Sequence, residues 1–525
     1  MIFKNMRKYL LIAVLAVLPF LAEAQNGPAI ARIVCGPYLQ SVTTDSFTVM
    51  WMTDVDAVGW VEIAPDNEEN FYYKDRPKYY DMRGHGLKPI GKIHKVTVGG
   101  LKPGTSYRYR VMMTAVQDYH NNYNPVYGKG SGAPAYKVDL PKATTLKEDY
   151  SEVRFAVVND VHAQDSLLRR LFADKEKNKE FDFVLFNGDM TSDLAYSEKI
   201  VRHYLKPASD LFADQTPLFM ARGNHEFRGR DALRISEYFD FPEHGPYYTF
   251  KYGKFLFLVL DGGEDKVDSD IENQGRLCSE PYLNEEAKWL KGVVESDEWK
   301  NAERRIVFNH IPPQIKDAWH GNLNMSEKFL PILNGAGVDL MLSGHVHKYS
   351  FREVGSTDAS FPVITNGQWQ RMEITVNAKK IAVRIYDTDG KLKSFGVDRI
   401  SAINILEDTQ FLRDEHIDIP SLFRESYGIW NNPEDPVEEI VLKYDSVDGA
   451  FVKTLPLHHS QQILSEDETG ITVKLRLRIT NDFVMELLSH SRSVEVVAPH
   501  TLRTRLYDTL RQAAERNKPI ETECD

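Results

Sequence analysis

The chain has 525 residues, of which 42% are hydrophobic, 11% aromatic and 27% charged. This composition is typical of folded proteins, and the length predicts about three or four domains of roughly 100–200 residues. The 64 Lys and Arg residues face 76 Asp and Glu residues, which gives a formal net charge of -12. Such a charge argues against a broad attraction to nucleic acid or anionic lipid, and we expect no nucleic-acid partner.

The N-terminus has the features of a secretory signal peptide. Basic residues at positions 4, 7 and 8 precede an apolar run over residues 9–21, which is followed by the sequence AEA up to Ala24. The run is shorter than the ~20 residues that a membrane-spanning helix needs, and the small residues fit a cleavage site. The sequence therefore predicts a signal peptide over residues 1–24, export to a bacterial periplasm or the extracellular space, and no later membrane span.

The chain contains three cysteines, Cys35, Cys278 and Cys524. They are too few for a disulfide scaffold, and none lies in a CxxC pair. The sequence therefore indicates neither a disulfide framework nor a thiolate metal site, and it leaves open whether Cys35 pairs with Cys278.

Residues 36–145 have the pattern of short strands and turns. In SFTVMWMTD (46–54), apolar Phe47, Val49 and Trp51 alternate with their neighbours, which predicts a strand with one packed face. The stretches GPYLQ (36–40) and LKPGTSYRYRV (101–111) resemble the N-terminal domain of purple acid phosphatase-type proteins. The resemblance implies a fibronectin type III-like β-sandwich over residues 25–147.

From about residue 150, predicted strands and helices alternate, as in layered α/β domains. Strands are expected at residues 153–160, 181–189, 216–224, 254–261, 304–310 and 338–345, with a final meander over 362–390. Helices are expected at residues 166–178 and 284–296, and a loop at 262–282. The sequence therefore predicts an α/β domain over residues 150–396.

Each of these strands ends in polar residues, and in open α/β sheets such ends meet at a ligand crevice. The candidate ligands are Asp160, His162, Asp189, Asn224, His310, His345 and His347. Nitrogen and oxygen ligands without sulfur suit Mn, Fe or Zn, and seven candidates exceed the four ligands of one zinc ion. The set predicts two divalent transition-metal ions, which can clamp a phosphoryl group and turn water into hydroxide near neutral pH. Phosphoester hydrolysis is the expected chemistry.

The same residues lie in motifs that follow one another in a characteristic order. DVH (160–162), GD (188–189), GNHE (223–226), VFNH (307–310) and GHVH (344–347) resemble the calcineurin-like metallophosphoesterase superfamily. The resemblance implies two mixed sheets flanked by helices over residues 153–395. It implies one ion held by Asp160, His162, Asp189 and His347, and a second held by Asp189, Asn224, His310 and His345. Asp189 would bridge the two.

The resemblance also implies roles for residues around the GNHE motif. His225 would lie near the substrate phosphate and protonate the leaving oxygen, while Glu226 would orient the loop or a neighbouring residue. Arg222 and Arg228 are candidates for binding phosphate oxygens, although a solvated charged loop is the alternative. Purple acid phosphatases carry a tyrosine where this chain has Ser192, so we expect no tyrosine–iron(III) chromophore.

The C-terminal part, residues 397–525, is predicted to be a compact α+β module. FVKTLPLHHSQQ (451–462) and LLSHSRSVEVVAPHTLRTRL (487–506) resemble the C-terminal part of WYL-type bacterial transcription regulators. No helix-turn-helix is apparent and the charge is mixed, so DNA binding is not expected. The adjacent His458 and His459 look like a metal pair, but a surface loop is the favoured interpretation.

An exported enzyme and a regulator fragment belong to different compartments. We hypothesise a recent gene fusion or an assembly artefact joined near residues 395–397. The leading hypothesis is an exported phosphoesterase in which hydroxide held by two metal ions attacks phosphorus in line. The alternative is a ligand-sensing or binding protein whose C-terminal module binds a small ligand or mediates oligomerisation. The sequence leaves open the oligomeric state and whether the substrate is a monoester or a diester.

Overall fold

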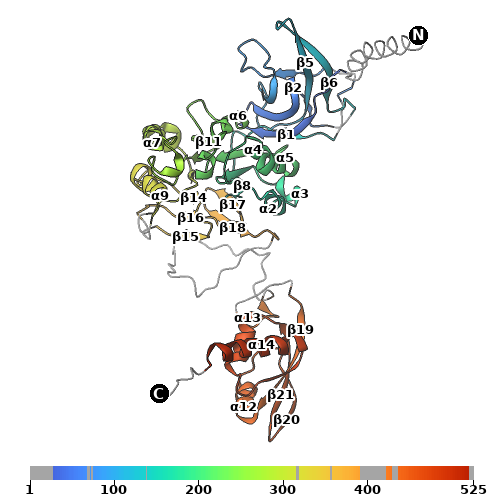
Figure 1. Cartoon of the computed structure of the whole chain (residues 1–525), viewed down its shortest axis with the longest axis vertical. Coiled ribbons are helices and arrows are strands. Elements are labelled where there is room, and N and C mark those ends of the chain that lie inside the picture. Colours follow the sequence, from blue (N-terminus) through green and yellow to red (C-terminus); the bar gives the residue numbers. More distant parts are fainter. Residues whose placement is uncertain are drawn as a thin grey trace, which may run out of the picture. The chain divides into compact units, whose positions relative to one another are not determined.

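The computed structural model describes residues 28–390 and 421–518, apart from gaps at 68–70, 73–74, 137–138, 315–317, 355–357, 422 and 429–434. The expected signal peptide, the junction near 395–397 and Cys524 lie outside these residues. The chain divides into two compact units, Met1–Lys393 and Ser394–Asp525 (Figure 1). None of the helices in the described ranges combines the length and apolar character that a membrane-spanning helix requires.

The N-terminal part of the first unit is a strand-rich domain. Its strands are β1 (Ile33–Gln40), β2 (Phe47–Pro65), β3 (Lys78–Tyr80), β4 (Gly91–Val98), β5 (Ser106–His120), β6 (Asn124–Gly132) and β7 (Lys142–Thr144). The first part of the long strand β2 pairs with β1 and β4, and its second part pairs with β3 and β5. Strand β2 therefore joins two groups of strands.

Strand β2 is buried on both faces along its first half, whereas its alternating sequence predicts one packed face. Trp51 stacks on the His94 ring inside the strand-rich domain. On the other face, Met50 and Met52 pack with Tyr38 in a cluster shared with helices of the α/β domain that follows. Contact between the two domains therefore explains the second packed face, which local periodicity does not encode.

The middle of the first unit is an α/β domain on two mixed sheets. One sheet, in the order β10-β9-β8-β17-β18, consists of β8 (Glu152–Val158), β9 (Phe183–Asn187), β10 (Leu218–Ala221), β17 (Arg371–Asn377) and β18 (Ile381–Tyr386). The other, in the order β11-β12-β13-β14-β16-β15, consists of β11 (Tyr248–Tyr252), β12 (Phe255–Val259), β13 (Arg304–Phe308), β14 (Leu340–Ser343), β15 (Ser350–Arg352) and β16 (Val363–Thr365). β8, β9 and β10 run parallel, as do β12, β13, β14 and β16. The predicted pair of mixed sheets is confirmed.

The core of this domain lies between the two sheets. Phe155 of β8 stacks on Phe183 of β9 and meets Phe257 of β12 and Phe308 of β13 edge-on. Helices cover the outer faces: α2 (Asp165–Leu171) and α5 (Lys206–Leu211) on the first sheet, and α7 (Ser279–Glu295), α8 (Asp297–Lys300) and α10 (Leu330–Leu333) on the second (Figure 1). Most positions of the parallel strands are buried on both faces, in keeping with their largely apolar sequences.

Several elements of this domain differ from the sequence prediction, and the following three are examples. The helix expected over 166–178 is interrupted, and a short helix, α3 (Lys175–Asn178), begins after Asp174, whose carboxylate accepts two backbone N–H groups of the new helix. The helix expected from residue 284 begins at Ser279, inside the expected loop. Strand β11 was not expected, because most of its side chains are partly exposed and give no clear period.

The two described cysteines, Cys35 and Cys278, are both free thiols. Cys35 is buried, and its burial raises the pKa of the thiol to about 12. The bridge between them that the sequence left open is therefore absent, and Cys35 stays protonated at neutral pH.

Asp182, just before β9, titrates differently in the folded and unfolded protein. Burial raises the pKa of this carboxyl group to about 6, while its Oδ2 accepts the backbone N–H of Arg154 at 2.8 Å. An unfolded aspartate has a pKa of ~3.9, so the folded protein binds the proton more tightly. The contribution of Asp182 to stability is therefore present at low pH and is lost as the pH rises from about 4 through 6.

We expect Asp182→Asn to be more stable than the natural protein at pH 8 by about 1–2 kcal/mol, allowing for partial exposure, and equally stable below about pH 4. The isosteric amide keeps an oxygen for the N–H of Arg154 and carries no charge. Urea unfolding of both proteins across this pH range measures the difference. The exposed Asp56→Asn serves as control, and a pH-independent difference for Asp182→Asn would contradict the prediction.

The second unit is a small α+β module, as predicted. Strands β19 (Val437–Asp445), β20 (Gln462–Asp467), β21 (Gly470–Arg478) and β22 (Glu495–Ala498) form an antiparallel sheet in the order β20-β21-β19-β22, packed with α12 (Ser446–Thr454), α13 (Asn481–Ser489) and α14 (His500–Arg516). The ring of His458, next to His459, lies 3.0 Å from the backbone oxygen of Arg424 and 2.7 Å from Ser460 Oγ. Hydrogen bonds within the module therefore occupy both nitrogens of His458, as in a structural loop.

Candidate metal centre

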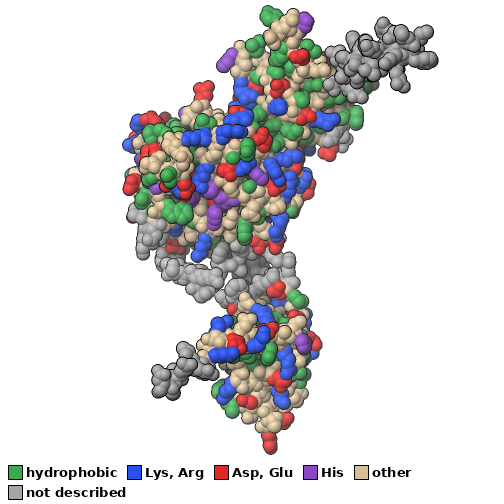
Figure 2. Space-filling view, viewed as in Figure 1, with side chains coloured by type: hydrophobic (Ala, Val, Ile, Leu, Met, Phe, Trp, Pro, Cys, Tyr) green, Lys and Arg blue, Asp and Glu red, His purple; other side chains and the backbone are tan. Residues whose placement is uncertain are grey.

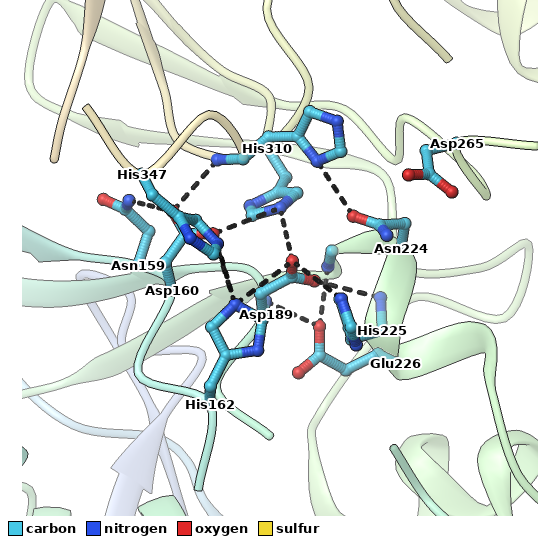
Figure 3. Close-up of polar contacts among 12 residues, drawn as sticks. Asn159, Asp160, His162, Asp189, Asn224, His225, Glu226, Asp265, His310 and His347 are labelled. Carbon is cyan, nitrogen blue, oxygen red and sulfur yellow. Dashed lines mark hydrogen bonds and ion pairs between the residues drawn. The ribbon is translucent and has the colours of Figure 1, made fainter. Parts of the chain in front are cut away.

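The seven predicted ligands come together at one end of the two sheets. In chain order they follow the carboxyl ends of β8 (Asp160, His162), β9 (Asp189), β10 (Asn224), β13 (His310) and β14 (His345, His347). Because both sheets contribute, the ligands surround the point where the carboxyl ends of the parallel strands meet (Figure 3). The site opens to solvent, since the side chains of His347 and His162 are 45% and 14% exposed. Figure 2 shows several histidine side chains on the surface of the first unit.

One group of donor atoms is formed by Asp160, His162 and His347. His347 Nε2 lies 3.2 Å from Asp160 Oδ1 and 3.0 Å from His162 Nε2. His162 Nε2 is 3.8 Å from Asp160 Oδ1. One donor atom from each residue lies within 4.8 Å of the others, so the three side chains could share one metal ion.

A second group is formed by Asp189, His310 and His345, which also lie within 4.8 Å of one another. His310 Nε2 is 3.1 Å from Asp189 Oδ2, and the side-chain amide of Asn224 lies 3.0 Å from His345 Nδ1. Asp189 Oδ2 is also 3.9 Å from His162 Nε2 of the first group. The Asp189 carboxylate therefore faces both groups, as a bridging ligand would.

Several buried donor atoms of these groups lack hydrogen bonds. Asp160 Oδ1, His310 Nε2 and His345 Nε2 are buried and accept or donate none within the described part of the chain. Buried polar atoms without partners are unfavourable, and a coordinated cation would satisfy them. Imidazole, carboxylate and amide donors without sulfur suit Mn, Fe or Zn. The residues present thus fit divalent transition-metal ions.

The charges around the site favour ionised carboxylates and at least one neutral imidazole. Burial acts to raise the pKa of Asp160, but the neighbouring imidazole rings of His162, His310 and His347 hold it below the usual range. Burial acts to lower the pKa of His310, but Asp189 and Asp160 raise it to about 10. The positive charge on His310 marks a place where the surrounding carboxylates favour a cation. Burial and the charge of His310 lower the pKa of His345 to about 4, which leaves its ring neutral.

Three asparagines orient the ligands, and the sequence analysis did not find them. Asn187 accepts a hydrogen bond from His310 Nδ1 through its backbone oxygen at 2.7 Å, which leaves Nε2 toward the site. Asn159 donates to Asp160 Oδ2, and Asn366 donates to Asn159 Oδ1 at 2.8 Å. Such partners fix the tautomer and direction of metal ligands. Asn159 and Asn187 stand next to predicted motifs, but no local signal marks Asn366.

Five of the predicted ligands have left-handed backbone conformations that non-glycine residues rarely adopt. The φ angles of Asp160, His162, Asp189, His345 and His347 are 53°, 47°, 54°, 72° and 56°. Gly188 shares this conformation with φ of 85°, and a Cβ there would lie 2.4 Å from His310 Nδ1. The chain therefore bends sharply at the strand ends, which aims several side chains inward from short loops.

His225 lies beside the donor groups, and its Nε2 is 3.2 Å from Arg228 Nη1. Its Nδ1 lies 2.7 Å from the backbone oxygen of Ser192, to which it donates, and its Nε2 lies 3.9 Å from Asp189 Oδ2. Burial lowers the pKa of His225. The structure also groups His225 with His162 and Asp189 as possible donors to one ion. The position is compatible with the predicted proton donor, a role that requires a proton on Nε2 as well as on Nδ1.

Glu226 is fully buried and supports the loop that carries Asp189. Its carboxylate accepts the backbone N–H groups of Asp189 at 2.8 Å, Met190 at 2.9 Å and Gly223 at 2.8 Å. Burial and the charge of Asp189 raise the pKa of Glu226 to about 7. The geometry thus matches the predicted role of Glu226 in orienting this loop.

The two candidate phosphate-binding arginines occupy different places. Arg222 donates to Asp261 and lies over the Phe227 ring, 4.0 Å from its centroid, so it is held inside the domain away from the donor groups. Arg228 pairs with Glu264 at 2.7 Å, and its Nη1 lies 3.2 Å from His225 Nε2. The geometry therefore gives no support to a phosphate contact by Arg222, whereas Arg228 reaches the site.

An exposed aromatic residue outside the predicted motifs also borders the site. Trp319 is 56% exposed, and its ring meets the His345 ring edge-on with 5.1 Å between centroids. No motif marks Trp319 in the sequence, because it stands more than twenty residues from His345 and only tertiary structure brings the two together. A flat apolar surface therefore lies next to a predicted ligand of the second group.

Three segments of the chain match known families. Residues 153–349 match "Calcineurin-like phosphoesterase", residues 35–127 match "Purple acid Phosphatase, N-terminal domain" and residues 436–514 match "WCX domain". These matches confirm the resemblances found in the sequence, the WCX domain being a WYL-type C-terminal domain.

Two of the similar proteins are phosphatases from a plant and from human. Purple acid phosphatase 21 of Arabidopsis thaliana is 22% identical over 288 residues, which are 53% of this chain and 59% of that protein. The human serine/threonine-protein phosphatase CPPED1 is 26% identical over 189 residues, 33% of this chain and 56% of that protein. This chain thus spans about three fifths of these relatives.

A solved purple acid phosphatase from yellow lupin seeds aligns with a TM-score of 0.46 at 15% identity, covering 70% of this chain and 73% of that one. Each of the three family matches falls within one structural part of the chain: the strand-rich domain, the α/β domain or the C-terminal α+β module. The chain therefore carries a calcineurin-like phosphoesterase domain, preceded by a purple acid phosphatase N-terminal domain and followed by a WCX domain.

Proposed function

We propose that this protein is an exported phosphoester hydrolase that uses two divalent transition-metal ions. The observation that supports it best is the place of Asp189, whose carboxylate lies within reach of both His310 and His162. A carboxylate shared by two donor groups is what a two-metal site requires. When bound, a metal pair would act as a Lewis acid toward phosphoryl oxygens and lower the pKa of a water nucleophile.

The chain's own residues would bind the substrate and move a proton. His225 keeps its Nδ1 donor bond to the Ser192 backbone, so its imidazolium form, which carries a second proton on Nε2, is the form that would give a proton to the leaving oxygen. Arg228, next to Nε2, would hold a phosphoryl oxygen through the Nη1 group that faces the site. Its other amino group, Nη2, stays bonded to Glu264, which fixes the direction of the guanidinium.

The test combines metal analysis with two substrates. The purified protein should contain about two transition-metal ions per chain and should hydrolyse p-nitrophenyl phosphate, bis-p-nitrophenyl phosphate or both. Removal of the metals by a chelator should abolish activity, and Mn, Fe or Zn should restore it. The ratio of the two rates distinguishes a phosphomonoesterase from a phosphodiesterase. A protein that stays inactive with every one of these metals would contradict the proposal.

Export is part of this proposal and rests on the pattern of residues 1–24. Expression of the full chain in a bacterium, followed by fractionation, should place the mature protein outside the cytoplasm with Gln25 as its first residue. An uncleaved chain in the cytoplasm would contradict export and leave the proposed chemistry untouched.

Trp319 is expected to favour substrates with a flat leaving group. Stacking of this kind contributes about 0.5–1.5 kcal/mol, so Trp319→Ala should raise KM for p-nitrophenyl phosphate about 2–10-fold. The KM for methyl phosphate should change little, because a methyl group offers no ring to stack. Steady-state kinetics with both substrates measures the split, and Tyr123→Ala, at an exposed tyrosine of the strand-rich domain, is the matched control. Equal effects on both substrates would contradict the prediction.

A further inference from the structure

A cavity of about 510 Å³ lies where the strand-rich domain meets the α/β domain. Its walls come from the turn after β1, from residues 146–148, from β10 and from β11. Small-molecule sites typically have volumes of about 300–1,000 Å³. Among the described residues that line it, none is a predicted metal ligand. The cavity is therefore distinct from the metal centre and large enough for a small molecule.

The wall formed by β10 and β11 is aromatic. Phe219 stacks on Phe250 with 3.9 Å between ring centroids and 10° between planes, and Tyr248 lies beside it. Val42 and Leu146 of the strand-rich domain face the same space and are 7% and 9% exposed. Flat apolar walls of this kind suit a planar apolar ring. Such a ring would be buried away from water and would stack on the aromatic side chains.

The cavity also contains a polar group without a partner. Gln40 lines it and is only 4% exposed. Gln40 Oε1 accepts the backbone N–H of Asp240, which fixes the amide. Gln40 Nε2 donates to no acceptor in the described part of the chain. A buried donor that lacks an acceptor is unfavourable, so a ligand oxygen placed against Nε2 would be favoured.

From the volume, the aromatic wall and the free donor, we propose that this cavity binds a small, planar, mostly apolar molecule with a carbonyl or carboxylate oxygen. The ring lies against Phe219 and Phe250, and the oxygen accepts a hydrogen bond from Gln40 Nε2. Lys147 also lines the cavity, and within the described residues its ammonium group forms a contact with the Tyr150 ring but no ion pair. A carboxylate would gain from this charge, whereas an uncharged carbonyl would depend on Gln40 alone.

The proposal is tested by titrating the full chain with 2-naphthoate, 2-naphthamide and naphthalene in ligand-observed NMR. We expect the naphthamide or the naphthoate to bind saturably and naphthalene, which lacks the oxygen, to bind at least tenfold more weakly. Gln40→Glu keeps an oxygen for the Asp240 N–H but removes the free donor, so it should weaken naphthamide at least tenfold. Gln462→Glu, on exposed strand β20, should leave binding unchanged.

Val42→Phe provides a second variant, because a larger side chain fills the cavity without changing Gln40. It should weaken both oxygen-bearing probes at least tenfold, and circular dichroism shows whether each variant is folded. If naphthoate binds more tightly than naphthamide, the Lys147 charge contributes to binding. If the two probes bind equally, Gln40 alone recognises the ligand oxygen. Absence of saturable binding, or affinities unchanged in both variants, overturns the proposal. Binding needs no turnover, so the result is independent of the proposed phosphoesterase activity.

Discussion

Replacing Asp189 by asparagine should lower the phosphoesterase activity by at least ~10³-fold and should leave less than one metal ion per chain. Asp189 Oδ2 faces both donor groups, at 3.1 Å from His310 Nε2 and 3.9 Å from His162 Nε2. An amide has no negative charge and offers a single acceptor oxygen, so it cannot serve two cations. Metal analysis and kinetics on p-nitrophenyl phosphate measure the two effects together.

The two histidines of the GHVH motif provide the matched controls. His347 lies in the group with Asp160, and His345 lies in the group with His310. His347→Ala and His345→Ala should therefore each retain about one ion, bound at different sites, while Asp189→Asn loses both. If all three variants lost the same amount of metal, the assignment of Asp189 as a bridge would be wrong.

Glu226→Ala should lower the free energy of unfolding of the first unit by about 3–5 kcal/mol. The carboxylate of Glu226 is buried and accepts backbone N–H groups from Asp189, Met190 and Gly223. Without it these donors stay buried with no partner, and each such group costs about 1–3 kcal/mol. Urea unfolding followed by near-UV circular dichroism measures the loss.

Two control variants distinguish the loss of these buried hydrogen bonds from the general effect of replacing a glutamate. Glu226→Gln keeps one acceptor oxygen and should lose roughly half as much stability as Glu226→Ala. Glu243→Ala, at an exposed position, should stay within about 0.5 kcal/mol of the natural protein. A loss of less than about 1 kcal/mol for Glu226→Ala would show that water or a backbone shift satisfies the freed N–H groups.

The strand ends of the α/β domain could be predicted because buried parallel strands have unbroken apolar sequences. Residues 183–186 are one such run, and the polar residues Asn187 and Asp189 follow it closely. Only a few polar side chains at the strand ends are then candidates for ligands or catalytic residues. The order of the motifs indicates which of these side chains lie close together. The helix over 166–178 was wrong in its middle, because the capping side chain of Asp174 ends one turn and begins another.

Contacts between residues remote in sequence could not be predicted in the same way. Arg222 and Asp261 are separated by 39 positions, and Asn159 and Asn366 by 207. No local pattern tells which arginine beside the GNHE motif turns toward a buried carboxylate and which reaches His225. The second buried face of β2 could not be predicted for the same reason, because it is buried by contacts with the α/β domain.

The left-handed backbone at five predicted ligands sets function against stability. Glycine adopts these positive φ angles without the steric cost of ~1 kcal/mol that a residue with a Cβ atom carries. At His162 and His347, whose side chains are partly exposed, a glycine would relax the chain and remove a ligand in the same step. A selection for thermal stability alone would therefore enrich chains that fold better and lack these candidate ligands. The centre persists only in a protein that is selected for what the centre does.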